Sequence, residues 1–342
     1  MNNMKIGYAL GGGAARGLSH IGVLKVLHKH GISPDVIAGT SIGAIIGALY
    51  AAGYDPEDIE KIVLGMDWKK LASLVDWTLP FSGLLQGKRV VSLLRSILGD
   101  ITFSQLRFDF ACVATDILSG EQVVLREGVL VEAVRASISI PGIFTPVELS
   151  GRYLVDGGLV NTVPVSICRE MGADYVIGVN VIPEPVRVIC SSNKNQQFQA
   201  CDLIDLREIL KEDKLAETDN SGRRPVLSHI NDIENATKRF LVSHRSDRDG
   251  NIEPPQLLKK RRRPKLKSKT PRLIDVLSQS LTISEYRLAV ENLKDADLAI
   301  NPIVEEIGFW QFNNAAKAIA AGEQAANNAL EKIKVHASSK RL

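Results

Sequence analysis

Residues 39–43 read Gly39-Thr40-Ser41-Ile42-Gly43, which has the spacing Gly-x-Ser-x-Gly. The three residues before this stretch are Val-Ile-Ala, the composition of a short buried strand, and residues 42–52 are apolar on every side of a helix. The pattern therefore predicts that Ser41 lies where a strand turns sharply into a buried helix. Glycine is expected at both ends because a side chain at either position would collide with its neighbours in so tight a turn.

Such a turn pushes Ser41 Oγ outward, toward the N-terminus of the helix that follows. Free N–H groups and the positive end of the helix dipole point at the same place. This arrangement suits a nucleophilic serine, but a packed Gly/Ser turn explains the motif alone equally well.

A glycine-rich loop, residues 11–17, lies between a predicted strand at 5–10 and a predicted helix at 18–30. Its backbone N–H groups can bind a negative charge, either in a dinucleotide or in the oxyanion of an acyl transfer. The dinucleotide interpretation is the weaker, because Arg16 stands where Gly-x-Gly-x-x-Gly needs its last glycine. The acidic residue expected after the second strand is also missing, since Asp35 precedes that strand.

The whole chain predicts an α/β fold with three layers and a mostly parallel central sheet. Residues 66–98 are rich in large apolar side chains and fit either a lipid-facing lid or ordinary packing. Further strands are predicted at 108–115, 122–126, 152–155, 175–181 (a central strand) and 298–300, and further helices at 130–137, 165–171, 273–294 and 315–335, with another beginning near 55.

The chain has a net charge of +3, but its charge is unevenly distributed. Residues 186–270 hold 19 Lys/Arg and 12 Asp/Glu and lack sustained periodicity. A structureless loop of this length does not belong inside a compact fold. We therefore expect a catalytic core at 1–184, a polar basic insertion at 185–270, and helices and a strand at 271–336 that complete the core.

The four cysteines form no Cys-x-x-Cys pair, and a chain of 342 residues needs no disulfides to fold. The first residues do not resemble a signal peptide, and no run of 18 apolar residues exists. These features predict reduced thiols and a cytoplasmic protein.

A serine nucleophile needs a base, which is usually histidine. A hydrolase triad of the order Ser, Asp, His would need a histidine after Asp156. The histidines there are His229, His244 and His336, and none follows a predicted strand of the core. The remaining candidate is a dyad of Ser41 and Asp156, because a carboxylate shielded from water has a raised pKa and can act as the base.

Three stretches, residues 10–17, 39–43 and 156–158, together resemble the patatin-like phospholipase family, in particular its small bacterial members. The resemblance covers about residues 4–184 and resumes at 271–300. It implies a serine lipid acyl hydrolase that acts on phospholipids or lysophospholipids through an acyl-enzyme, with no cofactor and no metal. The alternative is a protein of the same fold with little turnover that serves as a regulator or scaffold.

The resemblance also assigns roles to single residues. Bacterial relatives often carry a fourth glycine where this chain has Ala14, so a positive φ there would be strained. By the family's pattern, the nucleophile is Ser41 and its partner Asp156, the oxyanion hole is formed by the amides of Gly12, Gly13 and Ala14, Arg16 holds the loop or faces a lipid phosphate, and the elbow and turn glycines are Gly39, Gly43, Gly157 and Gly158.

The basic run at residues 259–269 has three interpretations. A solvated linker is the simplest. Attraction to anionic lipid head groups is the second, and it would suit an enzyme that visits a bilayer surface. Nucleic-acid binding is disfavoured, because no aromatic residues alternate with the basic ones.

Overall fold

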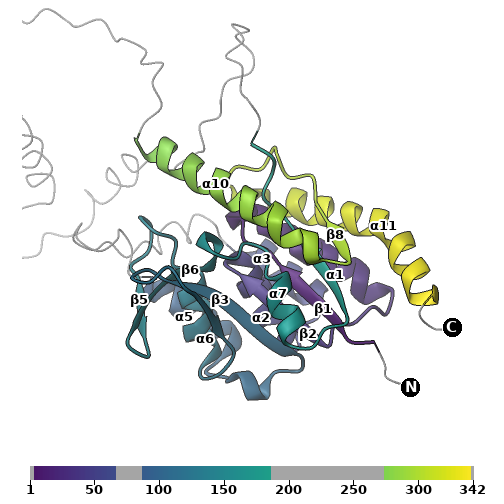
Figure 1. The fold of residues 1–342 in the computed structure, drawn as a ribbon, viewed down its shortest axis with the longest axis horizontal. Helices are drawn as coiled ribbons and strands as arrows, with labels where there is room; N and C mark the ends of the chain where they lie inside the picture. The colour runs from purple at the N-terminus through teal and green to yellow at the C-terminus, as the bar shows by residue number, and fades with distance from the viewer. Residues whose placement is uncertain (1–3, 67–86, 186–272, 340–342) are drawn as a thin grey trace, which may run out of the picture. The chain divides into compact units, whose positions relative to one another are not determined.

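The computed structural model describes residues 4–66, 87–185 and 273–339 (Figure 1). Nearly all of the predicted insertion at 185–270, including the basic run 259–269, lies outside the described residues. The same is true of residues 67–86, which make up most of the apolar stretch that precedes residue 98.

One eight-stranded sheet forms the middle layer of the fold (Figure 1). The strand order is β5-β6-β3-β2-β1-β7-β8, and β4 also pairs with β3. The strands β3, β2, β1, β7 and β8 pair in parallel in this order. The pairs of β4 and β6 with β3, and of β5 with β6, are antiparallel. The predicted mostly parallel sheet is thus confirmed. The strands are β1 (Ile6–Leu10), β2 (Val36–Thr40), β3 (Asp109–Asp116), β4 (Gln122–Leu125), β5 (Val147–Leu149), β6 (Arg152–Asp156), β7 (Tyr175–Val179) and β8 (Leu298–Ile300).

The predicted central position of the strand near residue 175 is wrong. β7 is paired on both sides, but only β8 lies beyond it, so β7 is next to the edge. Its burial on both faces reflects helical layers above and below the sheet, which give an interior strand the same composition wherever it lies.

Helices cover both faces of the sheet. α7 and α10 pack on one face, where Ile167 and Ala289 join a cluster with Ala9 and Val36, and the other helices pack on the opposite face. No helix among the described residues is both long and apolar enough to cross a membrane. The helices are α1 (Ser19–Lys29), α2 (Ile42–Ala51), α3 (Pro56–Gly65), α5 (Lys88–Leu98), α6 (Leu130–Ser137), α7 (Val165–Glu170), α10 (Leu273–Asn292) and α11 (Ala315–Ser339).

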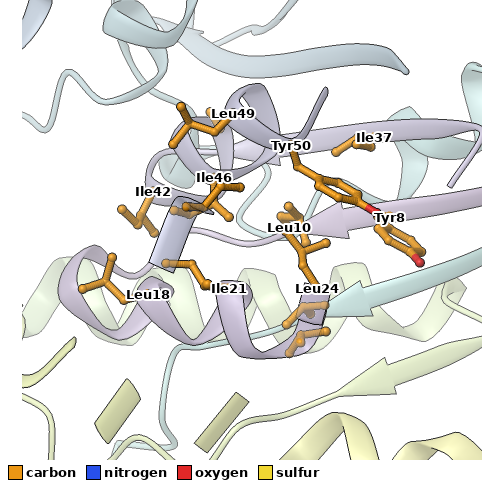
Figure 2. Packing of buried hydrophobic residues seen from close by; sticks show 14 of the residues in the cluster. Tyr8, Leu10, Leu18, Ile21, Leu24, Ile37, Ile42, Ile46, Leu49 and Tyr50 are labelled. Carbon is orange, nitrogen blue, oxygen red and sulfur yellow. The ribbon is translucent and has the colours of Figure 1, made fainter. Parts of the chain in front are cut away.

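The larger core cluster lies between the sheet and helices α1 and α2 (Figure 2). Side chains alternate along β1: Tyr8 and Leu10 enter this cluster, and Ala9 enters the cluster on the other face. Ile21 and Ile46 extend the cluster from the two helices, as Figure 2 shows. Each such fully buried side chain stabilises the fold by about 1.5–3 kcal/mol. This packing fixes the C-terminal ends of β1 and β2, where the predicted loop and elbow begin.

Candidate active site

The elbow after β2 has the strained geometry that its sequence predicts. Ser41 adopts φ 55 and ψ −121, outside the regions that side-chain-bearing residues favour. A β-carbon at Gly39 would lie 2.5 Å from the Gly43 carbonyl oxygen, and one at Gly43 would lie 2.1 Å from the Leu10 oxygen. Both positions therefore require glycine. The Ser41 N–H donates to Ser137 Oγ at 3.0 Å, which anchors the turn to the end of α6.

Sheet register brings Asp156 to this elbow. Thr40 at the end of β2 pairs with Val113 of β3, and the next residue of β3, Ala114, pairs with Asp156 of β6. The chain then passes directly over β3, where a β-carbon at Gly157 would lie 2.3 Å from the Val113 carbonyl oxygen. Glycine at this position lets the end of β6 approach the neighbouring strand closely enough for its carboxylate to face the serine.

Ser41 Oγ donates a hydrogen bond of 2.6 Å to Asp156 Oδ2. The other carboxyl oxygen, Oδ1, accepts the N–H of Gly158 at 2.8 Å. Ser41 is 7% exposed and Asp156 4%. Burial raises the pKa of Asp156 to about 6, against the lowering effect of its two hydrogen bonds. Asp156 is therefore ionised at neutral pH and close enough to accept the proton of the serine hydroxyl.

The glycine loop lies over the serine. A β-carbon at Gly12 would lie 3.5 Å from that of Ser41, but the Gly12 N–H donates to the Thr162 carbonyl at 3.0 Å. The prediction that this amide joins an oxyanion hole is therefore at odds with the structure. No described residue accepts a hydrogen bond from the amides of Gly13 or Ala14.

Ala14 has φ 49, a positive value that glycine adopts far more readily than alanine. The strain is of order 1–2 kcal/mol, and the residue keeps its N–H. Gly13, with φ 149, has a β-carbon position only 2.6 Å from the Val181 side chain, so this residue must be glycine.

Two basic residues, one in the loop and one in α1, hold the loop in place. Arg16 Nε donates to the Ile307 carbonyl at 2.8 Å, which ties the loop to the chain after β8. The ring of His20 lies 2.8 Å from the Gly11 carbonyl through Nε2. Burial lowers the pKa of His20 to about 4, so the ring is neutral at pH 7 and Nε2 is the donor in this contact. The holding role predicted for Arg16 fits its bond to Ile307.

The glycine loop, the elbow and the turn at Asp156 thus lie close together in the structure. The family model of the patatin-like phospholipases matches residues 8–169, which include the glycine loop, the elbow and Asp156. This region, just under half of the chain, is of the patatin-like phospholipase type. The match begins within β1 and ends within α7, so the family region holds every predicted site residue.

Relatives match over about half of this chain. An uncharacterized NTE family protein of Mycobacterium tuberculosis is 35% identical over 177 residues, which are 52% of this chain and 49% of that protein. The lysophospholipase NTE1 of Scheffersomyces stipitis is 34% identical over 185 residues, 53% of this chain and 12% of that protein. This chain thus matches about half the length of the first relative and a smaller part of the second.

Among solved structures, VipD from Legionella pneumophila is similar with a TM-score of 0.45 and 14% identity, over 97% of this chain and 77% of that chain.

Sequence reasoning missed two residues that hold the site together. Ser137 accepts the amide of the nucleophile, and His20 supports the glycine loop. Neither lies in one of the three motifs, and each residue type is common on helices. The only local signal is that His20 lies on the apolar side of a helix, where a polar ring needs a partner.

Proposed function

We propose that this protein is a serine lipid acyl hydrolase that cleaves phospholipids or lysophospholipids with Ser41 as nucleophile and Asp156 as base. The observation that carries the proposal is the 2.6 Å hydrogen bond between Ser41 Oγ and Asp156 Oδ2 in a buried site. The match of residues 8–169 to a phospholipase family model supports the lipid-hydrolase class.

The first half of the reaction forms the acyl-enzyme. Ser41 Oγ attacks the ester carbonyl carbon while Asp156 accepts the hydroxyl proton. The oxyanion that forms is stabilised by the amides of Gly13 and Ala14, at a few kcal/mol for each donor. The C–O bond to the alcohol then breaks, and Asp156 returns its proton to the departing alkoxide. The site thereby regains an ionised Asp156.

The second half releases the fatty acid. Water attacks the acyl carbonyl, and Asp156 accepts a proton from that water. Collapse of the oxyanion breaks the bond to Ser41 Oγ, which takes the proton back. Because Asp156 must be ionised at the start of both halves, the rate should fall as the pH drops below about 6, the pKa of its carboxyl.

The test is release of fatty acid from phosphatidylcholine and lysophosphatidylcholine in mixed micelles. We expect release by the wild type, loss of at least about 10³-fold in Ser41→Ala and Asp156→Asn, and no loss in Asp109→Asn, an exposed aspartate at the start of β3. Full activity in Ser41→Ala or Asp156→Asn would refute the assignment. A folded wild type that releases nothing would favour the regulator or scaffold alternative.

We further propose a cytoplasmic enzyme that contacts anionic membranes through residues 259–269, a basic run known here from the sequence alone. The test is cosedimentation with phosphatidylglycerol vesicles at low and high salt. Replacing the basic residues of this run by glutamine should weaken sedimentation at low salt and leave hydrolysis of a micellar substrate unchanged. Equal sedimentation of both proteins would return the run to the role of a linker.

A further inference from the structure

Glu285 of α10 brings a second carboxyl group to the proposed active site. A β-carbon at Gly158 would lie 3.0 Å from Glu285 Oε1 and 3.2 Å from Asp156 Oδ1, so both carboxyl groups lie over the same glycine. α10 is fixed there by Ala289, which is fully buried against the sheet, and by Asn292, whose Oδ1 accepts the N–H of Val163 at 3.2 Å.

Two charged groups of the described residues act on the Glu285 carboxyl: Asp156 and Arg16. Partial burial and, to a smaller extent, the charge of Asp156 together raise the pKa of Glu285 to about 8, and Arg16 opposes both effects. Two carboxylates in one shielded site repel each other, so one of them keeps its proton longer. The hydrogen bonds from Ser41 and Gly158 favour the charge on Asp156. At neutral pH, Glu285 is therefore the protonated partner.

We propose that Glu285 is a specificity-determining residue of the active site: as a neutral carboxyl it admits anionic lipids, and as a carboxylate it rejects them. The inference rests on the proposed function, in that it concerns the substrates of the same site. In a phospholipid only the glycerol backbone separates the ester from the phosphate. The phosphate is therefore only a few bonds from the carbonyl that reaches Ser41, and Ser41 and Glu285 both lie beside Asp156.

A negative charge on Glu285 lowers the affinity of the site for anionic lipids. A charged Glu285 repels a phosphate. Any effect of this charge on the chemical step is shared by charged and uncharged esters. It cancels in the ratio of kcat/KM for an anionic lipid to kcat/KM for an uncharged one. A phosphodiester does not titrate between pH 6 and pH 10, so a change in this ratio reports on the protein. Partial shielding near a protein surface makes a tenfold change a reasonable expectation.

The experiment compares phosphatidylglycerol with diacylglycerol of the same acyl chains, in uncharged detergent micelles, across the pH range from about 6.5 to 9.5. In the wild type the ratio should fall about tenfold as the pH rises through about 8. In Glu285→Gln, which is neutral at every pH, the ratio should stay flat. Glu291→Gln is the matched control: Glu291 is exposed on the same helix and paired with Lys294, and this variant should follow the wild type.

A binding measurement keeps this inference separate from the proposed function. Ether-linked analogues of the two lipids cannot be cleaved, so the ratio of their dissociation constants on Ser41→Ala needs no turnover. The same loss of preference for the anionic lipid above about pH 8 is expected there. In Asp156→Asn the neighbouring charge is gone, so Glu285 should ionise more easily and the change should move to lower pH.

Different results would overturn the proposed function and the proposed role of Glu285. No fatty acid release, together with a pH-dependent binding ratio, would overturn the proposed function and keep the role of Glu285. A wild-type ratio that does not change with pH, or a Glu285→Gln ratio that falls as the wild-type ratio does, would overturn the role of Glu285 and leave the hydrolase intact.

Discussion

At the scale of single residues, the nucleophile stands out because its backbone is strained. Ser41 has φ 55 and ψ −121, a conformation that glycine adopts far more readily than residues with a β-carbon. Such a conformation costs about 1–3 kcal/mol and persists only where its surroundings enforce it. Here the enforcing contacts are the glycines on both sides and the bond from Ser41 N–H to Ser137. The protein thus gives up stability to hold the Ser41 hydroxyl beside Asp156.

This strain predicts a difference between two inactive variants. Ser41→Ala and Ser41→Gly both lose the hydrogen bond to Asp156, but only glycine relieves the backbone. We expect Ser41→Gly to be more stable than Ser41→Ala by about 1–2 kcal/mol in urea unfolding. Equal stability of the two variants would mean that the turn carries no strain.

Asp156 provides a second residue-scale prediction. Its pKa of about 6 lies above the value of about 3.9 for an exposed aspartate, so the folded state binds the proton more tightly than the unfolded state. Keeping the carboxylate charged therefore destabilises the fold above pH 6, and this penalty disappears as the pH falls from about 6 toward 4. We expect Asp156→Asn to be more stable than the wild type by about 2–3 kcal/mol at pH 7 and by little at pH 4. A constant difference in Tm across this range would contradict the raised pKa.

At the scale of elements, the closest approach is the crossing of α1 and α11. A β-carbon at Gly22 would lie 1.9 Å from the Ile319 carbonyl oxygen, and one at Gly322 would lie 1.9 Å from the Ser19 oxygen. Backbones this close leave no room for a methyl group on either helix. Because α1 begins at the end of the glycine loop, this crossing also fixes the loop beside Ser41.

Adding one methyl group should push these helices apart. We expect Gly322→Ala to destabilise the protein by at least about 2 kcal/mol, despite the better helix propensity of alanine. Gly65→Ala is the control, since Gly65 is exposed at the end of α3 and no atom of the described residues lies within 4 Å of its β-carbon position. It should be neutral or slightly stabilising. The measurement is thermal unfolding of both variants, and equal Tm values would show that the crossing tolerates a side chain.

Most elements could be predicted from hydrophobic periodicity and glycine signals. The helix expected at 42–52 is α2 (Ile42–Ala51), and the helix expected at 273–294 is α10 (Leu273–Asn292). α5 was not predicted, because it lies in a stretch where large apolar residues obscure the helical period. α11 runs to Ser339, beyond its expected end near 335, because no glycine or proline stops it there.

The site was predictable only where its residues lie in motifs. Ser41 and Asp156 stand beside glycines at strand ends, and the structure brings them together. Glu285 could not be predicted, because it lies on a helix beyond the 185–270 segment and its neighbours carry no signal. The bond from Gly12 to Thr162 was equally hidden, since it depends on how two distant loops meet.

At the scale of the whole molecule, the proposed site is assembled from both sides of the 185–270 segment. The glycine loop, the elbow and Asp156 come from the N-terminal part, whereas β8 extends the same sheet and Glu285 reaches Gly158 from α10. The described residues on both sides of this segment belong to one compact unit. The core should therefore need the residues after 271 to form its active site.

Two shortened variants test which parts of the chain the active site needs. Replacing residues 186–270 by a flexible Gly/Ser linker should leave the Tm close to that of the full chain. The rate of ester hydrolysis should stay within about twofold. Ending the chain after residue 185 should abolish soluble expression or activity, because β7 would lose its neighbour β8 and α1 would lose α11. Loss of activity in the linker variant would show that the segment contributes to the site.

The central claim is that Ser41 is an activated nucleophile whose base is Asp156. Intact-mass labelling with a fluorophosphonate measures this directly, because such probes react with activated serines whatever the natural substrate. We predict one adduct on the wild type, mapped to Ser41 and absent from Ser41→Ala and Asp156→Asn. An adduct that persists in Ser41→Ala, or a wild type that stays unlabelled while a control serine lipase reacts, would contradict the account.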